Sequence, residues 1–377
     1  MEQKSNLKEV ALLFSKLGII GFGGPAAHIA MMQDEVVTKR KWITEQHFID
    51  LIGATNLIPG PNSTEMAIHI GHERAGWKGL ITAGICFILP AVLITGFFAW
   101  LYKAYGQLPE IQPFIYGIKP AIIAIILAAI YPLAKKSFKT IELSIIGLIT
   151  LILSLFQFNE IYVMFGAGFF ALLLAFIRNK TINTTAKNIL PFTLLQVSKT
   201  TLASSTNLNL FFVFLKIGAI LFGSGYVLFA FLDSELVSKG ILTRHQLIDA
   251  IAVGQFTPGP VFSSVTFIGY QINGFTGAVV SIIGIFLPSF IFIAILNPFV
   301  KKMRNSKPFS IFLDAVNVAS IAIIIAVCLH LGKETIVDWR TILIAVISIL
   351  FTFGFRKINS ALIVLGGSVI GYLLTFI

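Results

Sequence analysis

Charged side chains are scarce in this chain. Of its 377 residues, 12% are Asp, Glu, Lys or Arg, whereas 56% are hydrophobic. Soluble domains carry about a quarter charged residues, so this composition excludes a water-soluble protein. We interpret the chain as an integral membrane protein, with the lipid bilayer as its main partner.

Cysteine is also scarce. The chain has two cysteines, Cys86 and Cys328, and each lies inside an apolar run. This pattern excludes a disulfide framework and any cysteine-based metal site. We also find no phosphate-binding Walker loop and no nucleophile elbow. We therefore expect no enzymatic activity, no metal and no cofactor.

The formal net charge of +11 comes from basic residues in short loops between the apolar runs. Such residues set topology and contact anionic lipid headgroups, so they do not indicate nucleic-acid binding. A positive field would also favour an anionic substrate. Residues 1–9 are polar and lead into Val10 without a small-residue cleavage site, so we expect no cleaved signal peptide.

A Pro-Gly-Pro loop occurs twice. Residues 58–63 read Ile-Pro-Gly-Pro-Asn-Ser, and residues 257–262 read Thr-Pro-Gly-Pro-Val-Phe. Proline removes a backbone donor and restricts the residue before it, so each loop must break a helix. In a membrane, such a break must be buried in protein or line a polar cavity. Paired broken helices in the two halves of a chain indicate a transporter's binding site.

The loops belong to an internal duplication. Residues 14–18 (Phe-Ser-Lys-Leu-Gly) match residues 214–218 (Phe-Leu-Lys-Ile-Gly), and Leu89-Pro90 matches Leu287-Pro288. Glu35, Lys39 and Asp50 match Glu235, Lys239 and Asp249. We therefore predict an N-terminal repeat (1–178), a polar cytoplasmic linker (179–208) and a C-terminal repeat (209–377).

Positive charge gives the orientation of the repeats. The basic loops include 33–46, 72–78, 135–139 and 178–199. They all fall on the cytoplasmic side if each Pro-Gly-Pro element is re-entrant and each repeat crosses the membrane about five times. An odd number of crossings inverts the second repeat and places the N-terminal tail outside. We thus predict an all-α polytopic membrane protein made of two inverted repeats.

Lys16 and Lys216 occupy matching positions inside apolar runs, seven residues before Gly23 and Gly223. An ammonium in a membrane is costly unless it faces a cavity or an anion. We predict that both lysines bind substrate. The alternative is that each side chain extends to the headgroups.

Glycines and helix starts surround the two breaks. Free N–H groups and the positive ends of helix dipoles at such points can bind an oxyanion. Small residues can equally serve helix packing. The remaining candidate substrate-binding residues are Gly24, Asn56, Pro59, Gly60, Pro61, Asn62, Ser63, Gly225, Gln255, Pro258, Gly259, Pro260 and Ser263.

Glu65, His69 and His72 share one helical face after the first loop. A His/Glu chain inside a membrane suggests a proton relay, so we predict that these residues couple transport to protons. Metal ligation and an interfacial helix cap are the alternatives.

Three segments together resemble the chromate ion transporter family: Phe14 to Pro25, Thr55 to Pro61, and Gly76 to Gly79. Residues 214–260 resemble the C-terminal half of its long, two-domain members. The resemblance implies a multi-pass protein of a prokaryotic plasma membrane that exports chromate, driven by the proton gradient, with sulfate as a competing dianion. The second copy lacks the proline after Gly223-Ser224-Gly225 and the asparagine after Pro260, so the first half is expected to do more of the binding.

Our main hypothesis is a secondary transporter of a tetrahedral oxyanion, with chromate as its leading cargo and sulfate as the runner-up. The alternatives are uptake of sulfate or another oxyanion, an anion channel, and a membrane scaffold without transport. A homodimer is left open by the sequence.

Overall fold

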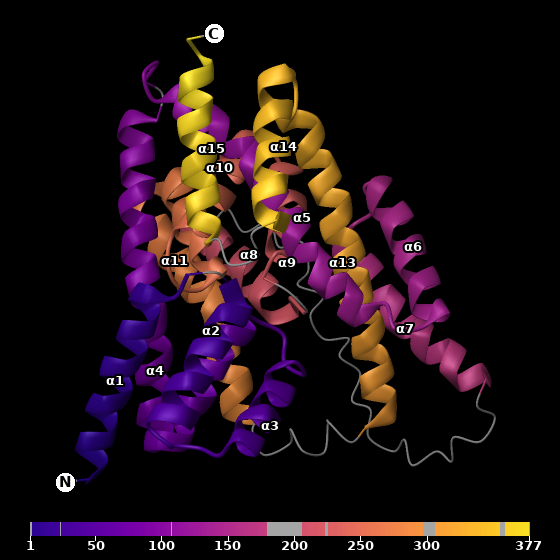
Figure 1. The fold of residues 1–377 in the computed structure, drawn as a ribbon. Coiled ribbons are helices and arrows are strands. Elements are labelled where there is room, and N and C mark those ends of the chain that lie inside the picture. Colours follow the sequence, from indigo (N-terminus) through magenta and orange to yellow (C-terminus); the bar gives the residue numbers. More distant parts are fainter. Residues whose placement is uncertain are drawn as a thin grey trace.

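The computed structural model describes residues 2–22, 24–106, 108–178, 206–222, 225–296, 306–354 and 359–376, and every regular element in these ranges is a helix (Figure 1). The first repeat contains α1 (Glu2–Ile20), α2 (Gly24–Gln33), η1 (Asp34–Lys39), α3 (Glu45–Thr55), α4 (Asn62–Tyr105), α5 (Gln112–Ser137), α6 (Ile141–Leu155) and α7 (Glu160–Arg178). The second contains α8 (Thr206–Ile220), α9 (Val227–Leu232), η2 (Asp233–Val237), α10 (Arg244–Phe256), η3 (Val261–Ser263), α11 (Ser264–Leu296), α13 (Lys307–Thr335), α14 (Trp339–Gly354) and α15 (Ser360–Leu374). Most of the predicted linker, with Gly23 and Gly223, lies outside the described residues.

Five segments in the described ranges are long and apolar enough to cross a membrane: Asn62–Tyr105, Gln112–Ser137, Glu160–Arg178, Val261–Ile295 and Lys307–Thr335. The polytopic all-α fold predicted from the sequence is confirmed.

The first Pro-Gly-Pro loop is the tip of a helical hairpin. α3 has 11 residues, or about 16 Å, which is too short to span a hydrocarbon core of about 30 Å. Nε2 of His47, at the start of α3, lies 3.5 Å from a carboxylate oxygen of Glu73. The chain therefore enters through α3, turns at the loop and returns through the first part of α4. The loop is re-entrant.

α4 then reverses direction. Gly76 has a φ of +60°, a backbone conformation that glycine adopts without steric cost. A Cβ on Gly71 would lie 2.4 Å from the carbonyl oxygen of Gly79, so the two parts of α4 run closely back along each other. The longer part, which follows Gly76, is the membrane-crossing one.

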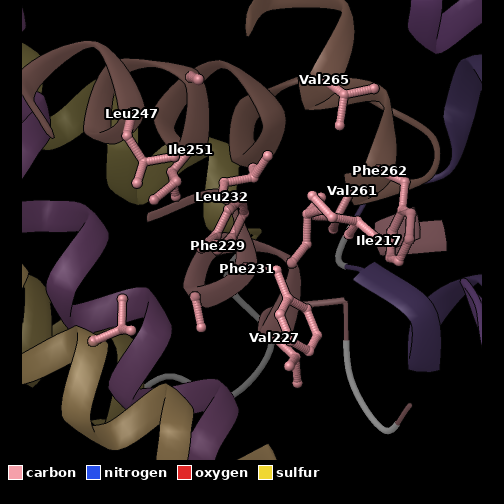
Figure 2. Packing of buried hydrophobic residues seen from close by; sticks show 14 of the residues in the cluster. Ile217, Val227, Phe229, Phe231, Leu232, Leu247, Ile251, Val261, Phe262 and Val265 are labelled. Carbon is pink, nitrogen blue, oxygen red and sulfur yellow. The ribbon is translucent and has the colours of Figure 1, made fainter. Parts of the chain in front are cut away.

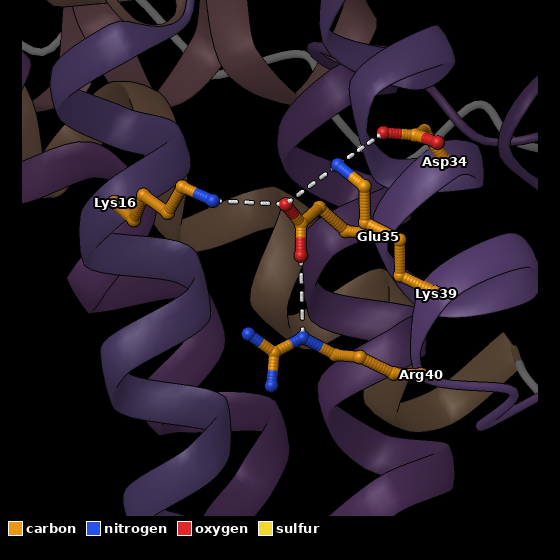
Figure 3. Close-up of polar contacts among 5 residues, drawn as sticks. All are labelled: Lys16, Asp34, Glu35, Lys39 and Arg40. Carbon is orange, nitrogen blue, oxygen red and sulfur yellow. Dashed lines mark hydrogen bonds and ion pairs between the residues drawn. The ribbon is translucent and has the colours of Figure 1, made fainter.

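The first apolar run, residues 9–32, is one of the five crossings expected in the first repeat. It also folds back. The ammonium of Lys16 on α1 lies 2.9 Å from the carboxylate of Glu35 on η1 (Figure 3). A continuous helix would separate these residues by about 28 Å. Arg74 pairs with Glu9 at 2.8 Å and lies over the ring of Trp42, so both hairpins share one base.

We call the end of the molecule that holds Glu9, Trp42 and Arg74 the first face. The expectation that the N-terminal tail lies opposite the basic loops was wrong: Glu9 lies beside Arg74 of the basic 72–78 loop. α1 ends at Ile20, and the chain turns back there before it crosses.

The second repeat repeats this path from the other side. Gly274 has a φ of +61°, and a Cβ on Gly269 would lie 2.4 Å from the carbonyl oxygen of Gly277. Tyr102, near the far end of α4, contacts both Asp249 of α10 and Phe267 of α11. The second hairpin therefore has its base at the opposite end, which we call the second face. α3 and α10 lie toward opposite ends of the molecule (Figure 1). These contacts show that the second repeat is inverted relative to the first.

The hairpin tips meet between the repeats. The N–H of Gly60 donates to the carbonyl of Leu221 at 2.8 Å, and the N–H of Gly259 donates to the carbonyl of Gly21 at 2.7 Å. Each loop is thereby held by the end of α8 or α1 from the other repeat.

The repeats are also interlocked by their long helices. α13 packs against α6 and α7, whereas α5 packs against α14 and α15. Around the second hairpin, apolar side chains of α8, α9, α10 and η3 form the largest buried cluster, in which Phe229, Phe231 and Phe262 are fully buried (Figure 2). This packing fixes the position of the second Pro-Gly-Pro loop.

Candidate functional site

A cavity of about 1280 Å³ extends from the first loop toward the first face. A water molecule occupies about 30 Å³ in the liquid, so the cavity can hold a small hydrated anion. Its walls come from both repeats, namely α2, α3, the start of α4 and α5 from the first, and α13, η3 and the α14–α15 region from the second.

Six of the residues predicted from the sequence line this cavity: Gly24, Asn56, Pro61, Asn62, Ser63 and Gly225. The remaining described candidates lie outside the lining: Lys16, Lys216, Pro59, Gly60, Gln255, Pro258, Gly259, Pro260, Ser263, Glu65, His69 and His72. Their predicted roles stay predictions.

The start of α4 supplies the polar part of the lining. Pro61 precedes the helix and provides no side-chain cap. The N–H groups of Asn62 and Ser63 meet no described backbone carbonyl, whereas those of Thr64 and Glu65 bond to Pro61. The first N–H groups of a helix carry a partial positive charge and attract anions.

Asn62 also closes the tip of the first hairpin. Its side-chain amide donates to the side-chain oxygen of Asn56 at 2.8 Å, which joins the end of α3 to the start of α4. This bond leaves further amide hydrogens of both side chains as donors toward the cavity.

The second loop contributes differently. Val261 and Phe262 occupy its cavity positions, with Gly225 and Tyr226 beside them. Ser263 is 1% exposed, and its hydroxyl lies 3.5 Å from that of Thr95. Of the two loops, the first therefore supplies more of the donors in the lining.

The sequence analysis missed one wall of the cavity. Ser310, Asp314, Asn317 and Ser320 of α13 all line it. Their spacing of four, three and three residues puts them on one helical face. The polar stripe in an otherwise apolar helix was a readable signal. Asn317 is the one amide in this stripe.

The charged residues of the lining are mostly basic: Lys135, Lys136 and Lys139 face Asp314. Lys139 pairs with Asp314 at 2.9 Å, so Lys135 and Lys136 leave the opening positive. Such a field concentrates anions in the cavity.

Lys16 and Lys216 take part in matching ion clusters instead, of which Figure 3 shows that of Lys16. Lys216 lies 2.6 Å from Glu235, which also accepts from Lys239 at 2.5 Å. In the first repeat, Glu35 pairs with Lys16, Lys39 and Arg40. The hydrogen bond from Lys16 is the main cause that lowers the pKa of Glu35 below its usual value. The lysine side chains are 51% and 44% exposed.

Glu65 lies behind the first loop, away from the cavity lining. It is fully buried and accepts a long hydrogen bond, 3.4 Å, from Ser289 of the second repeat. Its other carboxylate oxygen has no hydrogen-bond partner among the described residues, and neither has Nε2 of His69. His72 lies apart, edge-on to Trp77. Glu65 and His69 are thus two buried titratable groups on one face, close to the repeat interface.

In the part of the chain that the structure describes, no three His, Cys, Asp or Glu side chains form a group able to hold a metal ion. The neutral donors and lysines of the cavity suit an anion instead.

Comparison with known proteins agrees with this arrangement. A family model described as chromate transporter matches residues 8–172 and again residues 208–372, which confirms the internal duplication. A chromate transport protein of Cupriavidus metallidurans is 32% identical over 372 residues, covering 97% of this chain and 92% of that protein.

Two further relatives cover nearly the same length. A probable chromate transport protein of Synechococcus elongatus is 30% identical over 97% of this chain and 95% of its own length. An uncharacterized transporter of Methanocaldococcus jannaschii is 28% identical over 99% of this chain and 96% of its own. No solved structure matches the chain.

Proposed function

Because the chain belongs to the chromate transporter family, we propose that it is a secondary transporter that carries chromate out of the cell through this cavity. The family is one of ion transporters, and the apolar helices make the protein a multi-pass membrane protein.

The observation that carries the proposal is the cavity lining. It combines the uncapped start of α4, the amides of Asn56, Asn62 and Asn317, and a lysine-rich opening. A tetrahedral dianion needs several hydrogen-bond donors and a positive field, because leaving water costs it strong hydration. Sulfate has the same shape and charge and is the expected competitor.

Direction is inferred from the charged loops. The cavity opens beside Lys135, Lys136 and Lys139, at the opposite end of α5 from Lys119, which lies near Asp249 at the second face. Basic loops lie on the cytoplasmic side of membrane proteins. The structure then corresponds to a state that loads its cargo from the cytoplasm of a prokaryotic cell, as export requires.

Coupling to protons is assigned to Glu65. The fully buried carboxylate contacts the second repeat through Ser289, so protonation can change how the repeats pack at the loop. His69, one turn further along the helix, is the candidate to pass the proton on.

The test is chromate flux into inside-out vesicles or proteoliposomes, with and without sulfate. Asn62→Ala and Asn317→Ala should each raise KM about tenfold, since hydrogen bonds to a charged group contribute roughly 1.5–3 kcal/mol. Gln46→Ala, which removes an exposed amide on the outside of α3, is the matched control.

Saturable, sulfate-inhibited flux would support a transporter, whereas non-saturable flux down the gradient would indicate a channel. Flux of sulfate without flux of chromate would show that sulfate is the transported anion. Absence of flux for both anions would leave a scaffold and overturn the proposal.

A further inference from the structure

Asn56 and Gln255 stand at matching places before the two loops, but their surroundings differ. Asn56 is exposed and lines the cavity. Gln255 is 6% exposed; its side-chain oxygen accepts from Tyr226 at 3.4 Å and its carbonyl accepts from Ser360 at 3.2 Å. The position before the first loop is therefore open to the cavity, whereas the matching position before the second loop is closed.

A charged cluster crosses between the repeats on the closed side. Asp249 of α10 is 5% exposed and accepts from the hydroxyl of Tyr102 on α4 at 2.6 Å. Lys119 of α5 lies 3.7 Å from the other oxygen of Asp249 and 3.3 Å from Nδ1 of His245. Lys119 thus supplies the charge that a buried carboxylate needs. The cluster ties the second hairpin to two helices of the first repeat.

The matching positions on the open side carry a different charge pattern. α5 and α13 both have Pro-Phe as their second and third residues, and Lys119 and Asp314 each stand six residues after that proline. Asp50 is the counterpart of Asp249. The equivalent of the Lys119–Asp249 pair is therefore two carboxylates, which repel. Asp314 instead lines the cavity and pairs with Lys139.

In transporters with inverted repeats, alternating access lets each repeat take the conformation of the other. This step rests on the proposed function. When the second face opens, Lys119 comes to a position equivalent to the one that Asp314 occupies in the present structure. We propose that the Lys119–Asp249 pair holds the second face closed, and that Lys119 then lines the new cavity as a contact for the transported tetrahedral dianion.

Opening of the second face need not leave Lys119 without a partner. Separating it from Asp249 removes one counter-charge, and the dianion supplies another in its place. Lys119 thus pairs with Asp249 in the closed state and with the transported anion in the open state. Asp314, at the loading side, cannot act in this way.

The closed pair is tested by thiol labelling, which needs no transport. Cys86 and Cys328 are replaced by Ser, and Gln255→Cys is labelled with a membrane-impermeant reagent applied to the second face. Labelling should be slow, and Asp249→Asn or Lys119→Met should each accelerate it at least severalfold. Exchanging the charges, Lys119→Asp with Asp249→Lys, should slow it again. Arg178→Gln, which breaks an exposed ion pair with Glu142, should change nothing.

If both single variants elute as folded protein in size-exclusion chromatography and their labelling rates are unchanged, the Lys119–Asp249 pair does not hold the second face closed. The anion contact is read from KM measured with anion added at either face. Lys119→Met should raise KM at the second face more than at the first, and equal changes would overturn that part. If labelling responds as expected but wild type carries neither chromate nor sulfate, the pair stands and the proposed cargo fails.

Discussion

Gly60 lies directly against the buried carboxylate of Glu65: a Cβ on Gly60 would stand 2.3 Å from Oε1 of Glu65 and 2.5 Å from the hydroxyl of Ser289. The loop tip, the titratable group and the second repeat thus meet at one glycine. Gly259 has the equivalent position, where a Cβ would lie 2.7 Å from that of Ala91. Ala91 and Ser289 follow Pro90 and Pro288 at the same distance in sequence.

Substituting these glycines should destabilise the protein. Gly60 and Gly259 have φ values of +140° and +91°, which side chains disfavour, and strained backbone costs about 1–3 kcal/mol per residue. Gly60→Ala and Gly259→Ala should each lower the melting temperature by several degrees in detergent. Gly166→Ala is the control, because a Cβ there meets nothing within 4 Å. Equal melting temperatures for all three variants would contradict the close packing of the tips.

Substituting Lys16 and Lys216 distinguishes a structural ion pair from a contact with the substrate. Both pair with a buried glutamate and lie outside the cavity lining. We expect Lys16→Gln and Lys216→Gln to change the KM for chromate by less than about twofold, because each exposed ammonium acts through its ion pair. Thermal unfolding should occur at lower temperature in both. A large rise in KM with unchanged stability would instead support the substrate-binding role expected from the sequence.

The sequence revealed the duplication, the two breaks and six residues of the cavity lining, because glycine and proline constrain the backbone locally. It did not reveal that residues 9–32 fold back, because a hairpin of two short apolar helices has the same composition as one crossing. Nor did it reveal the ion pair that Lys16 makes. The partner that neutralises it, Glu35, stands 19 residues away, and only the fold brings the two together.

The stability of the first hairpin should depend on pH through Glu35. Its pKa is lowered in the folded state, mainly by the hydrogen bond from Lys16. A carboxyl with a lowered pKa stabilises the fold fully above its unfolded pKa of about 4.3 and loses that contribution as pH falls through the folded value. The melting temperature of wild type should therefore fall below about pH 4.3. Glu35→Gln should melt lower at neutral pH and show a shallower fall, and parallel curves would refute this role.

Replacing Glu65 tests the coupling directly. If one proton moves with each chromate through Glu65, a gradient of one pH unit contributes about 1.4 kcal/mol and changes the accumulation ratio about tenfold. Glu65→Gln keeps the shape of the side chain and its contact with Ser289 but cannot exchange a proton. We expect this variant to carry chromate down its own gradient at a measurable rate and to show no response to an imposed pH difference. Glu142→Gln, which alters an exposed carboxylate, should behave like wild type. Full gradient-driven accumulation in Glu65→Gln would move the coupling to another group, or to an exchange of anions without protons.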